Sequence, residues 1–577
     1  MDFFGVATIP GWLLTILLFF MTMCLYSLYC QTFFWRFGIP GPRPTLFLGN
    51  FMHYIKKGVL KADIEMVEKH GKFFGQYFGN MSSLMVSDVD IIKQICIKDF
   101  SKFPNRLAEG DNNDPYLKDA VSIARDEHWK FLRSSISPTF SSGKMRQMMP
   151  LLQKCVNDMV EKMKKDTENG EIVDVCKYCG SFSMDVIAST AFGMDVDAQN
   201  DPDNAFIKNA KKAFSSGFKN PMVLLIIFFP FTRRLLPYLK LSTMSKDMAI
   251  FFNSAVNTVI EERRSEKTKR QDLLGLMLNA HTEKENSEDN IELSSTTLKD
   301  FKKRPLTNHE ILANSLIFFL AGYETTANVL SFVLYCLALY PDYADKVRHE
   351  VADNIGKEKP TYDNVSKLQY LDMFICEVLR LYGSAARFNR ITEEDIEIGG
   401  YKIPKGTDIQ FPVGAIHRDP ELWPEPEVFD PERFTSENKE KRHPYAWLPF
   451  GVGPRNCVGM RLALTELKMA AVTIVQNFTV GRCDETEVPI TFHKGGFIKA
   501  QNAYRPYRDD RCPTKAAIPY KRLAQLTVYL LHKSINVIQI TGRHVCYVQL
   551  QFKLPSEKED EEESKTMLPM QKEHAQV

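Results

Sequence analysis

A stretch of about 33 residues contains no helix-breaking residue between position 307 and Pro341. Residues 307–310 (TNHE) have the residue types of a capping box, so a helix is expected to begin there. A helix of this length extends for about 50 Å. Its middle, residues 316–321, is apolar on nearly every side, so the helix has to run through the interior of a large domain.

The composition around this helix is that of a globular protein. Of the 577 residues, 44% are hydrophobic and 25% are charged, and the formal net charge is +2. These values exclude a chain that is disordered throughout, and the lack of a basic excess argues against nucleic acid as a partner. The 40 Phe and 23 Met favour a large, adaptable apolar interior. We expect a mainly α fold with small β-sheets.

Residues 1–36 are expected to form a short lumenal stub and a transmembrane anchor. No charge occurs between Asp2 and Arg36, and residues 12–29 are long enough to cross a ~30 Å hydrocarbon core as a helix. A cleaved signal peptide would need a basic start and a small-residue cleavage site, and neither is present. The alternative is a buried core helix. Because basic residues follow the span, the positive-inside rule places the N-terminus in the lumen and the body in the cytosol.

Three further segments complete the expected organisation. Residues 37–44 form a stiff Pro/Gly-rich spacer, and residues 45–512 form one large body. Residues 513–577 form an extension without an assigned role, acidic and disordered from about residue 555. Within the body, residues 222–229 (MVLLIIFF) are too short to span a bilayer. They are interpreted as either a core strand or an exposed apolar loop that dips into the membrane.

Residues 450–459 (FGVGPRNCVG) place a single cysteine in a glycine-rich turn. Three glycines and a proline force a tight backbone around Cys457, and helical periodicity begins at Met460. The N-terminus of a helix stabilises a thiolate. A protease nucleophile would need a histidine base, and no histidine is close in sequence. A metal-bound thiolate with a flat cofactor against the loop fits the segment better.

Polar residues interrupt the long apolar helix at residues 321–326 (AGYETT). Gly322 costs about 1 kcal/mol relative to alanine inside a helix, so a ligand is expected to approach the backbone there. Glu324 and Thr325 form an acid–alcohol pair that can relay protons to a ligand bound there. The alternative is that the threonine hydroxyls bond to carbonyls one turn earlier, which is our expectation for Thr326.

Two residue pairs have the spacing of a single helix face. Glu377 and Arg380 stand at i, i+3, and alone they would be an ordinary surface ion pair worth a few tenths of a kcal/mol. Trp129 and Arg133 stand at i, i+4, so an indole N–H and a guanidinium point the same way. Neither pair identifies a function by itself.

In their order along residues 38 to about 510, these motifs resemble the cytochrome P-450 superfamily. The cysteine segment is similar to the haem-ligand loop of that family, with Phe, Gly, Arg, Cys and Gly in register. The resemblance implies that Cys457 is the iron ligand and that residues 45–512 form a single haem-thiolate catalytic domain, with the long helix over the haem. It also implies haem contacts from four residues of the loop: Phe450, Gly453, Arg455 and Gly459.

The same resemblance assigns roles to the other motifs. It implies a structural cluster of Glu377, Arg380 and Arg433. Partners for the haem propionates are expected to be Arg106, Trp129, Arg133, Arg390 and Arg455. The oxygen-activation motif would supply the catalytic residues Ala321, Gly322, Glu324 and Thr325. The substrate pocket is expected to include Leu320, Ser384, Ala385, Ala386 and Phe497.

The amino-acid sequences of these segments look most like those of family 3, subfamily A, whose members oxidise drugs and steroids. The resemblance implies a monooxygenase that binds haem b and inserts one oxygen atom of O2 into lipophilic substrates such as steroids, fatty acids or xenobiotics. Electrons would come from NADPH through a flavoprotein reductase, with a cytochrome b-type donor as a second source. The protein would lie in the endoplasmic reticulum membrane with its catalytic domain in the cytosol. One departure is Gly383-Ser384, where the family usually has a proline.

Two alternative functions remain at this point. A relative of the same fold could rearrange a peroxide without external electrons, although the pair Glu324 and Thr325 speaks against an isomerase of that kind. A haem protein could also bind a lipophilic ligand without turnover.

Overall fold

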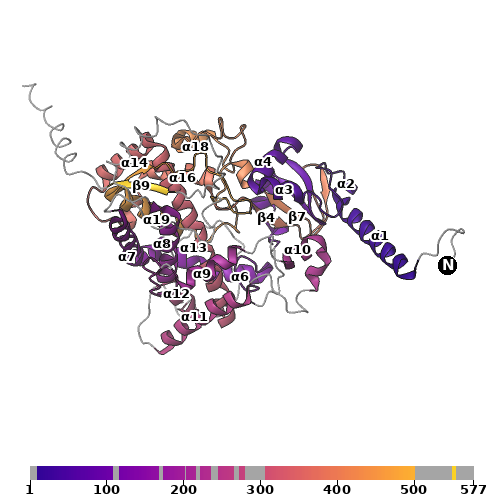
Figure 1. Ribbon diagram of the computed structural model, residues 1–577, viewed down its shortest axis with the longest axis horizontal. Coiled ribbons are helices and arrows are strands. Elements are labelled where there is room, and N and C mark those ends of the chain that lie inside the picture. The colour runs from indigo at the N-terminus through magenta and orange to yellow at the C-terminus, as the bar shows by residue number, and fades with distance from the viewer. Residues whose placement is uncertain are drawn as a thin grey trace, which may run out of the picture.

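The structure is a computed structural model that describes residues 10–107, 116–167, 173–201, 203–215, 221–235, 245–265, 272–279, 304, 306–500 and 549–553. Helices dominate these residues, and the strands form three small sheets (Figure 1). The predicted fold class, mainly α with small sheets, is confirmed. A helical region and a smaller strand-containing region lie beside each other, and the first helix projects from the latter.

The helices of the first half of the chain are α1 Gly11–Gln31, α2 Phe33–Arg36, α3 Phe51–Lys57, α4 Val59–His70, α5 Val89–Lys93, α6 Asp126–Ile136, α7 Ser142–Thr167, α8 Val175–Phe192, α9 Ala205–Ser215, α10 Pro221–Phe228, α11 Lys246–Ser265 and α12 Leu273–Asn279. Those of the second half are α13 Asn308–Leu339, α14 Pro341–Asn354, α15 Tyr362–Val365, α16 Gln369–Tyr382, α17 Val413–Ile416, α18 Ser436–Lys441 and α19 Met460–Asn477. The strands are β1 Phe73–Phe78, β2 Met81–Val86, β3 Val173–Asp174, β4 Phe388–Ile391, β5 Ile396–Ile398, β6 Tyr401–Ile403, β7 Asp408–Phe411, β8 Thr479–Arg482 and β9 Gln549–Lys553.

Helix α13 is the predicted central helix. The Thr307 side chain accepts from the Glu310 N–H, and the Glu310 carboxylate accepts from the Thr307 N–H, so the predicted capping box is confirmed. The helix ends one residue before Tyr340, which precedes Pro341. Two apolar clusters meet on it. One contains residues of α7, α8, α14, α16 and α19, and the other contains residues of α6, α8, α9, α11 and α12. The core therefore lies on both sides of α13.

The largest sheet has the strand order β1-β2-β7-β4. Strands β1 and β2 are antiparallel, β2 and β7 are parallel, and β7 and β4 are antiparallel, with Arg390 opposite Ile409. This sheet lies near the inner end of α1 (Figure 1). It carries β4, and hence one of the predicted site arginines, at its edge.

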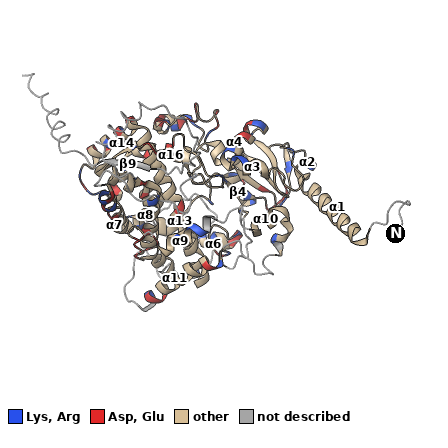
Figure 2. Cartoon of the chain, viewed as in Figure 1, with Lys and Arg blue, Asp and Glu red and all other residues tan. Residues whose placement is uncertain are grey.

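Helix α1 is the predicted apolar anchor helix. It is long and apolar enough to cross a membrane, and Figure 2 shows no charged residue along it. Helix α13 is also long and apolar enough to cross a membrane, but it is mostly buried in the protein, so it is a core helix. The last turns of α1 differ from the rest because Ser27 and Gln31 are buried polar side chains. Ser27 donates to Asn80 Oδ1 at 2.8 Å, and Gln31 donates to the Gly79 carbonyl at 3.1 Å.

Residues 222–229 were expected to form a core strand or an exposed loop, and neither secondary structure is correct, whereas the expected contact with a membrane stays a prediction. The segment forms helix α10, which begins at Pro221. Asn80 holds the end of this helix, since its N–H donates to the Ile227 carbonyl and its side-chain amide to the Phe228 carbonyl. A helix satisfies its backbone hydrogen bonds internally, whereas a strand at this place would need a neighbouring strand.

Part of the C-terminal extension packs on the body. Strand β9 lies between β3 and β8 and is antiparallel to both, with Val173 opposite Leu550 and Thr479 opposite Lys553. The extension therefore contributes a central strand to a three-stranded sheet. The disorder predicted from about residue 555 lies outside the described residues.

Candidate functional site

The cysteine loop closes immediately before α19. The Cys457 N–H donates to the Phe450 carbonyl at 2.9 Å, and helix α19 begins three residues later. Gly451 and Gly453 have φ of 69° and 77°, a region that favours glycine. A Cβ on Gly453 would lie 2.1 Å from the Cys96 carbonyl oxygen, so only glycine fits there. The spacing of glycines thus brings the loop against the rest of the protein and presents Cys457 at its end.

Cys457 differs in accessibility from the other cysteines of the described residues. It is exposed, whereas the others are buried or half-buried. The surrounding protein raises the pKa of its thiol, while the Gly459 N–H and the charges of Arg133 and Arg106 act in the opposite direction. The thiol is therefore accessible to a ligand. The Gly459 N–H and the two arginines favour its thiolate form.

Four arginines come together beside this loop from distant parts of the sequence. Arg133 of α6 donates to the Asn456 carbonyl at 2.9 Å, and Arg106 donates to the Arg455 carbonyl. Arg390 of β4 donates to the Val452 carbonyl at 3.2 Å. Arg455 itself donates to the Pro104 and Ala124 carbonyls, and its guanidinium lies 4.1 Å from the centre of the Trp129 ring. The structure thus brings all the predicted propionate partners together.

The electrostatics of these arginines are unusual. Burial and the neighbouring arginines lower the pKa of Arg106 to about 9 and that of Arg455 to about 8, although Asp126 partly offsets the effect at Arg455. Within the described residues, none of the four forms an ion pair with a carboxylate. Each retains a buried nitrogen without a hydrogen-bond partner, Nε of Arg106, Arg133 and Arg390 and Nη1 of Arg455.

A cluster of buried cations with unused donors matches an anionic ligand. Guanidinium groups bind carboxylates with two parallel hydrogen bonds, and removing a buried charge from water is costly unless a counter-charge is supplied. Haem b carries two propionates and an iron that takes a thiolate ligand. The arginine cluster and the accessible Cys457 therefore fit this cofactor.

Gly322 has a different neighbour from the one expected. A Cβ at this position would lie 2.7 Å from Cδ1 of Ile187 in α8. The Ser183 hydroxyl of the same helix donates to the carbonyls of Gly322 and Tyr323, both at 2.9 Å. The close approach that requires glycine at position 322 is therefore that of α8 to α13, and the approach of a ligand to this backbone stays a prediction.

The acid and the alcohol of α13 have separate partners. Glu324 is buried and forms an ion pair with Lys499, whose Nζ lies 2.7 Å from Glu324 Oε1. Thr325 donates to the Ala321 carbonyl at 2.6 Å, so this hydroxyl makes the bond that we expected for Thr326. Thr326 instead hydrogen-bonds the Glu466 carboxyl, and burial raises the pKa of that carboxyl to about 8. The structure does not join Glu324 directly to Thr325.

Sequence reasoning missed Lys499 and Glu466. Both were visible as charged residues in apolar surroundings, since Lys499 follows Phe497-Ile498 and Glu466 lies within the apolar periodicity of residues 460–476. Their burial with polar partners was not readable from local sequence, because each partner lies more than a hundred residues away.

The predicted pocket residues divide into exposed and buried ones. Ala321, Ala385 and Phe497 are exposed, and Ala385 and Phe497 form a β-bridge. Leu320 and Ala386 are buried, at 6% and 1% exposure. Ser384 donates through its hydroxyl to the Thr325 carbonyl at 3.0 Å. A small apolar surface therefore lies beside α13, and Ser384 ties its edge to that helix.

Glu377, Arg380 and Arg433 form a buried cluster. Arg380 binds Glu377 through two hydrogen bonds of 2.7 Å, and both side chains are fully buried. Arg433 Nε lies 3.5 Å from Glu377 Oε1. Arg380 also donates to the His417 and Pro426 carbonyls. The cluster thus joins α16 to the segment that precedes the cysteine loop.

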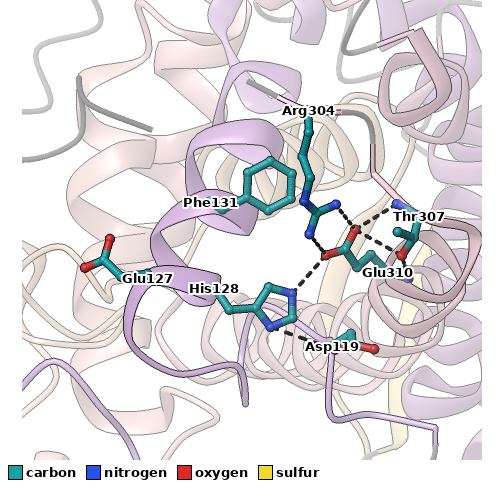
Figure 3. Close-up of a pocket in the computed structure, with 7 residues that line it drawn as sticks. All are labelled: Asp119, Glu127, His128, Phe131, Arg304, Thr307 and Glu310. Atoms are coloured by element: carbon teal, nitrogen blue, oxygen red, sulfur yellow. Dashed lines mark hydrogen bonds and ion pairs between the residues drawn. The ribbon is translucent and has the colours of Figure 1, made fainter. Parts of the chain in front are cut away.

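A polar pocket lies between the start of α13 and α6, and the side chains that line it connect the two helices (Figure 3). His128 of α6 lies 2.9 Å from Glu310 Oε1, and Arg304 binds the same carboxylate with two hydrogen bonds. Burial acts to raise the pKa of Glu310, but the bonds from His128, Arg304 and Thr307 outweigh it and hold that pKa well below its usual value. The pocket is lined by Asp119, Glu127, His128, Phe131, Arg304, Thr307 and Glu310. Glu310 thus pairs with His128, Arg304 and Thr307, and the contact fixes the helix that carries Trp129 and Arg133.

Comparison with known proteins identifies the family of this chain. The family model for Cytochrome P450 matches residues 39–506. The chain is 39% identical over 504 residues to Cytochrome P450 3A41 of Mus musculus, a match that covers 87% of this chain and 97% of the relative. It is 40% identical over 480 residues to Cytochrome P450 3A29 of Sus scrofa, covering 83% and 92%. The chain therefore belongs to the cytochrome P450 family and is a haem-dependent monooxygenase.

Proposed function

We propose that this protein is a membrane-anchored haem-thiolate monooxygenase that oxygenates lipophilic substrates with electrons delivered from NADPH by a flavoprotein reductase. The observation that carries the proposal is the cluster of four arginines beside the accessible Cys457, three of them buried and Arg106 half-buried, each with a buried nitrogen that has no hydrogen-bond partner. In this proposal Cys457 binds the iron, and Arg106, Arg133, Arg390 and Arg455 hold the propionates through their unused donors. The haem, when bound, supplies the oxidising chemistry.

The residues around α13 would select and protect the substrate. The small exposed side chains of Ala321 and Ala385 leave room for an apolar molecule, and Phe497 offers an aromatic contact. Thr325 is the hydroxyl placed at this surface, and it would exchange its bond with the Ala321 carbonyl for one that passes a proton to the reacting oxygen. Lipophilic compounds such as steroids, fatty acids or xenobiotics match this apolar lining.

The proposed location is the endoplasmic reticulum membrane, with the catalytic domain in the cytosol. Support comes from the apolar helix α1 and from the basic residues that follow it. Large apolar side chains are exposed close to the inner end of α1 and on residues 221–235, which begin with α10 and are named the α10 segment. They are Trp35, Phe37, Leu225, Phe231 and Leu235. Such a patch suits a surface that rests in the lipid headgroups. Residues 37–44 would serve as the spacer, and a cytochrome b-type protein as a second electron donor.

The test is reconstitution of the purified full-length protein in phospholipid vesicles with a flavoprotein reductase and NADPH. We expect a thiolate-type carbon monoxide difference band and NADPH-dependent oxygenated products from a panel of steroids, fatty acids and drugs. Rearrangement of an added lipid peroxide to an isomer without NADPH, with no oxygenated product from the panel, would favour an isomerase. A normal carbon monoxide band without any product from the panel would favour a protein that binds its ligand without turnover.

Replacing Thr325 by alanine is expected to uncouple the reaction. The substitution removes one hydroxyl and introduces a better helix former, so the fold should tolerate it. Loss of a positioned proton donor typically costs ~10²–10⁴ in rate, of which a water molecule can recover part. We expect NADPH consumption to continue, with more hydrogen peroxide and less product per NADPH.

The matched control is Thr325→Ser, which retains the hydroxyl and should retain the ratio of product to NADPH. Haem content and the carbon monoxide band should be unchanged in both variants. An unchanged ratio in Thr325→Ala would show that this hydroxyl serves only its bond to the Ala321 carbonyl.

A further inference from the structure

Glu324 and Lys499 form an ion pair inside the protein. Lys499 Nζ lies 2.7 Å from Glu324 Oε1, and the side chains are 7% and 2% exposed. The two residues are 175 positions apart in the sequence, so the pair joins the middle of α13 to the C-terminal part of the body. Buried ions are expensive to remove from water, so a pair at this place has to be held by accurate geometry.

The segment that carries Lys499 is bound to α13 at neighbouring points. Asn328 of α13 donates to the Ile498 carbonyl at 2.6 Å, and the Ile498 N–H donates to the Ser384 carbonyl at 2.9 Å. The Ser384 hydroxyl returns to α13 at the Thr325 carbonyl. Lys499 is thereby delivered to Glu324 by main chain that is fixed on both sides.

The same segment contacts the proposed substrate surface. Phe497, two residues before Lys499, is 38% exposed and bridges Ala385. One short piece of chain therefore presents an aromatic side chain to the substrate surface and an ammonium group to the acid of α13.

The pair engages only half of the carboxylate. Oε1 of Glu324 accepts from Lys499, whereas Oε2 is buried and has no hydrogen-bond partner among the described residues. Burial raises the pKa of Glu324, and the Lys499 charge and hydrogen bond oppose that rise. Without the ammonium, a carboxyl at this depth would take up a proton and become free to rotate.

We propose that Lys499 is a positioning residue for the oxygenation reaction, which holds Glu324 as an oriented carboxylate with one oxygen left free to accept a proton. This inference rests on the proposed role of Glu324 in oxygenation. Lys499 does not touch the substrate surface itself. It acts through Glu324, and it links the protonation and orientation of that carboxylate to the segment that carries Phe497.

The experiment compares Lys499→Met, Lys499→Gln and Lys499→Arg in the full-length holoenzyme. Infrared spectroscopy at neutral pH reads the protonation of Glu324 independently of turnover. We expect a new carboxylic acid carbonyl band in the methionine and glutamine variants, and its absence in the arginine variant and in Lys499→Met/Glu324→Gln. We also expect product per NADPH to fall roughly tenfold in the methionine and glutamine variants, with recovery in the arginine variant.

The possible outcomes separate this inference from the proposed function. One outcome would overturn the inference: Lys499→Met has lower thermal stability but no new infrared band and unchanged product per NADPH. The ion pair would then only stabilise the fold. If the methionine variant does not fold, the glutamine variant, which keeps a hydrogen-bond donor, decides between the same results. Failure of the wild-type protein to form products would refute the proposed function, while the infrared comparison would still report on the pair.

Discussion

Replacing Cys457 by alanine should abolish the thiolate-type carbon monoxide band and reduce product formation by more than about 100-fold. Loss of a group that merely orients a metal ligand typically costs 10–100-fold, so loss of the ligand itself should cost more. The fold should survive, because Cys457 is exposed and its N–H bond to the Phe450 carbonyl does not involve the side chain. The measurement is the reduced carbon monoxide difference spectrum of the purified variant, together with its haem content.

Cys483→Ala is the matched control. Cys483 is a half-buried thiol that follows β8, and its removal should leave the spectrum unchanged. A thiolate-type band that persists in Cys457→Ala would contradict the assignment of this cysteine as the ligand, since another thiol would then have to bind the iron.

Replacing Glu377 by alanine should leave little haem-loaded protein. The substitution removes both carboxylate oxygens from Arg380 and the nearest counter-charge from Arg433. Breaking a buried ion pair on one side typically costs about 3–5 kcal/mol, which is a large part of the stability of most proteins. The measurements are the ratio of haem to protein and the free energy of unfolding in urea.

The control for this prediction is Glu432→Ala in the neighbouring segment. Glu432 pairs with Lys346 at 3.1 Å, and both side chains are exposed, so its loss should cost less than about 1 kcal/mol. If Glu377→Ala kept a normal haem content and stability, the two bonds of Arg380 to the His417 and Pro426 carbonyls would be sufficient to hold this region.

Local patterns in the sequence predicted the parts of this protein that depend on local structure. The bounds of α13 followed from a capping box and from Pro341, and the geometry of the cysteine loop followed from its glycines. The resemblance to the family selected arginines from four distant segments that the structure brings together. Nothing in the spacing of Arg106, Arg133, Arg390 and Arg455 would have grouped them.

The errors came from contacts between segments that are distant in sequence. The need for glycine at position 322 was interpreted from the sequence of its own helix, whereas the contact with Ile187 of α8 requires it. The bond to a carbonyl one turn earlier was predicted for Thr326 but is made by Thr325. Thr326 differs because Glu466 of α19 supplies it with another partner. Residues 222–229 were read from composition alone, although Asn80 provides the contacts that end helix α10.

The burial of Ser27 and Gln31 affects how the body would sit on a bilayer. One face of the last turns of α1 is held by Asn80 and Gly79, whereas Leu28 and Tyr29 in the same turns are exposed. The part of the helix that lipid could surround on all sides, residues 11–26, extends for about 24 Å, which is shorter than a hydrocarbon core of roughly 30 Å. Such hydrophobic mismatch is relieved by thinning of the bilayer or by immersion of the flanking protein. A short anchor with a fixed base would thus draw the exposed Trp35 and the α10 segment into the interface and set the tilt of the whole domain.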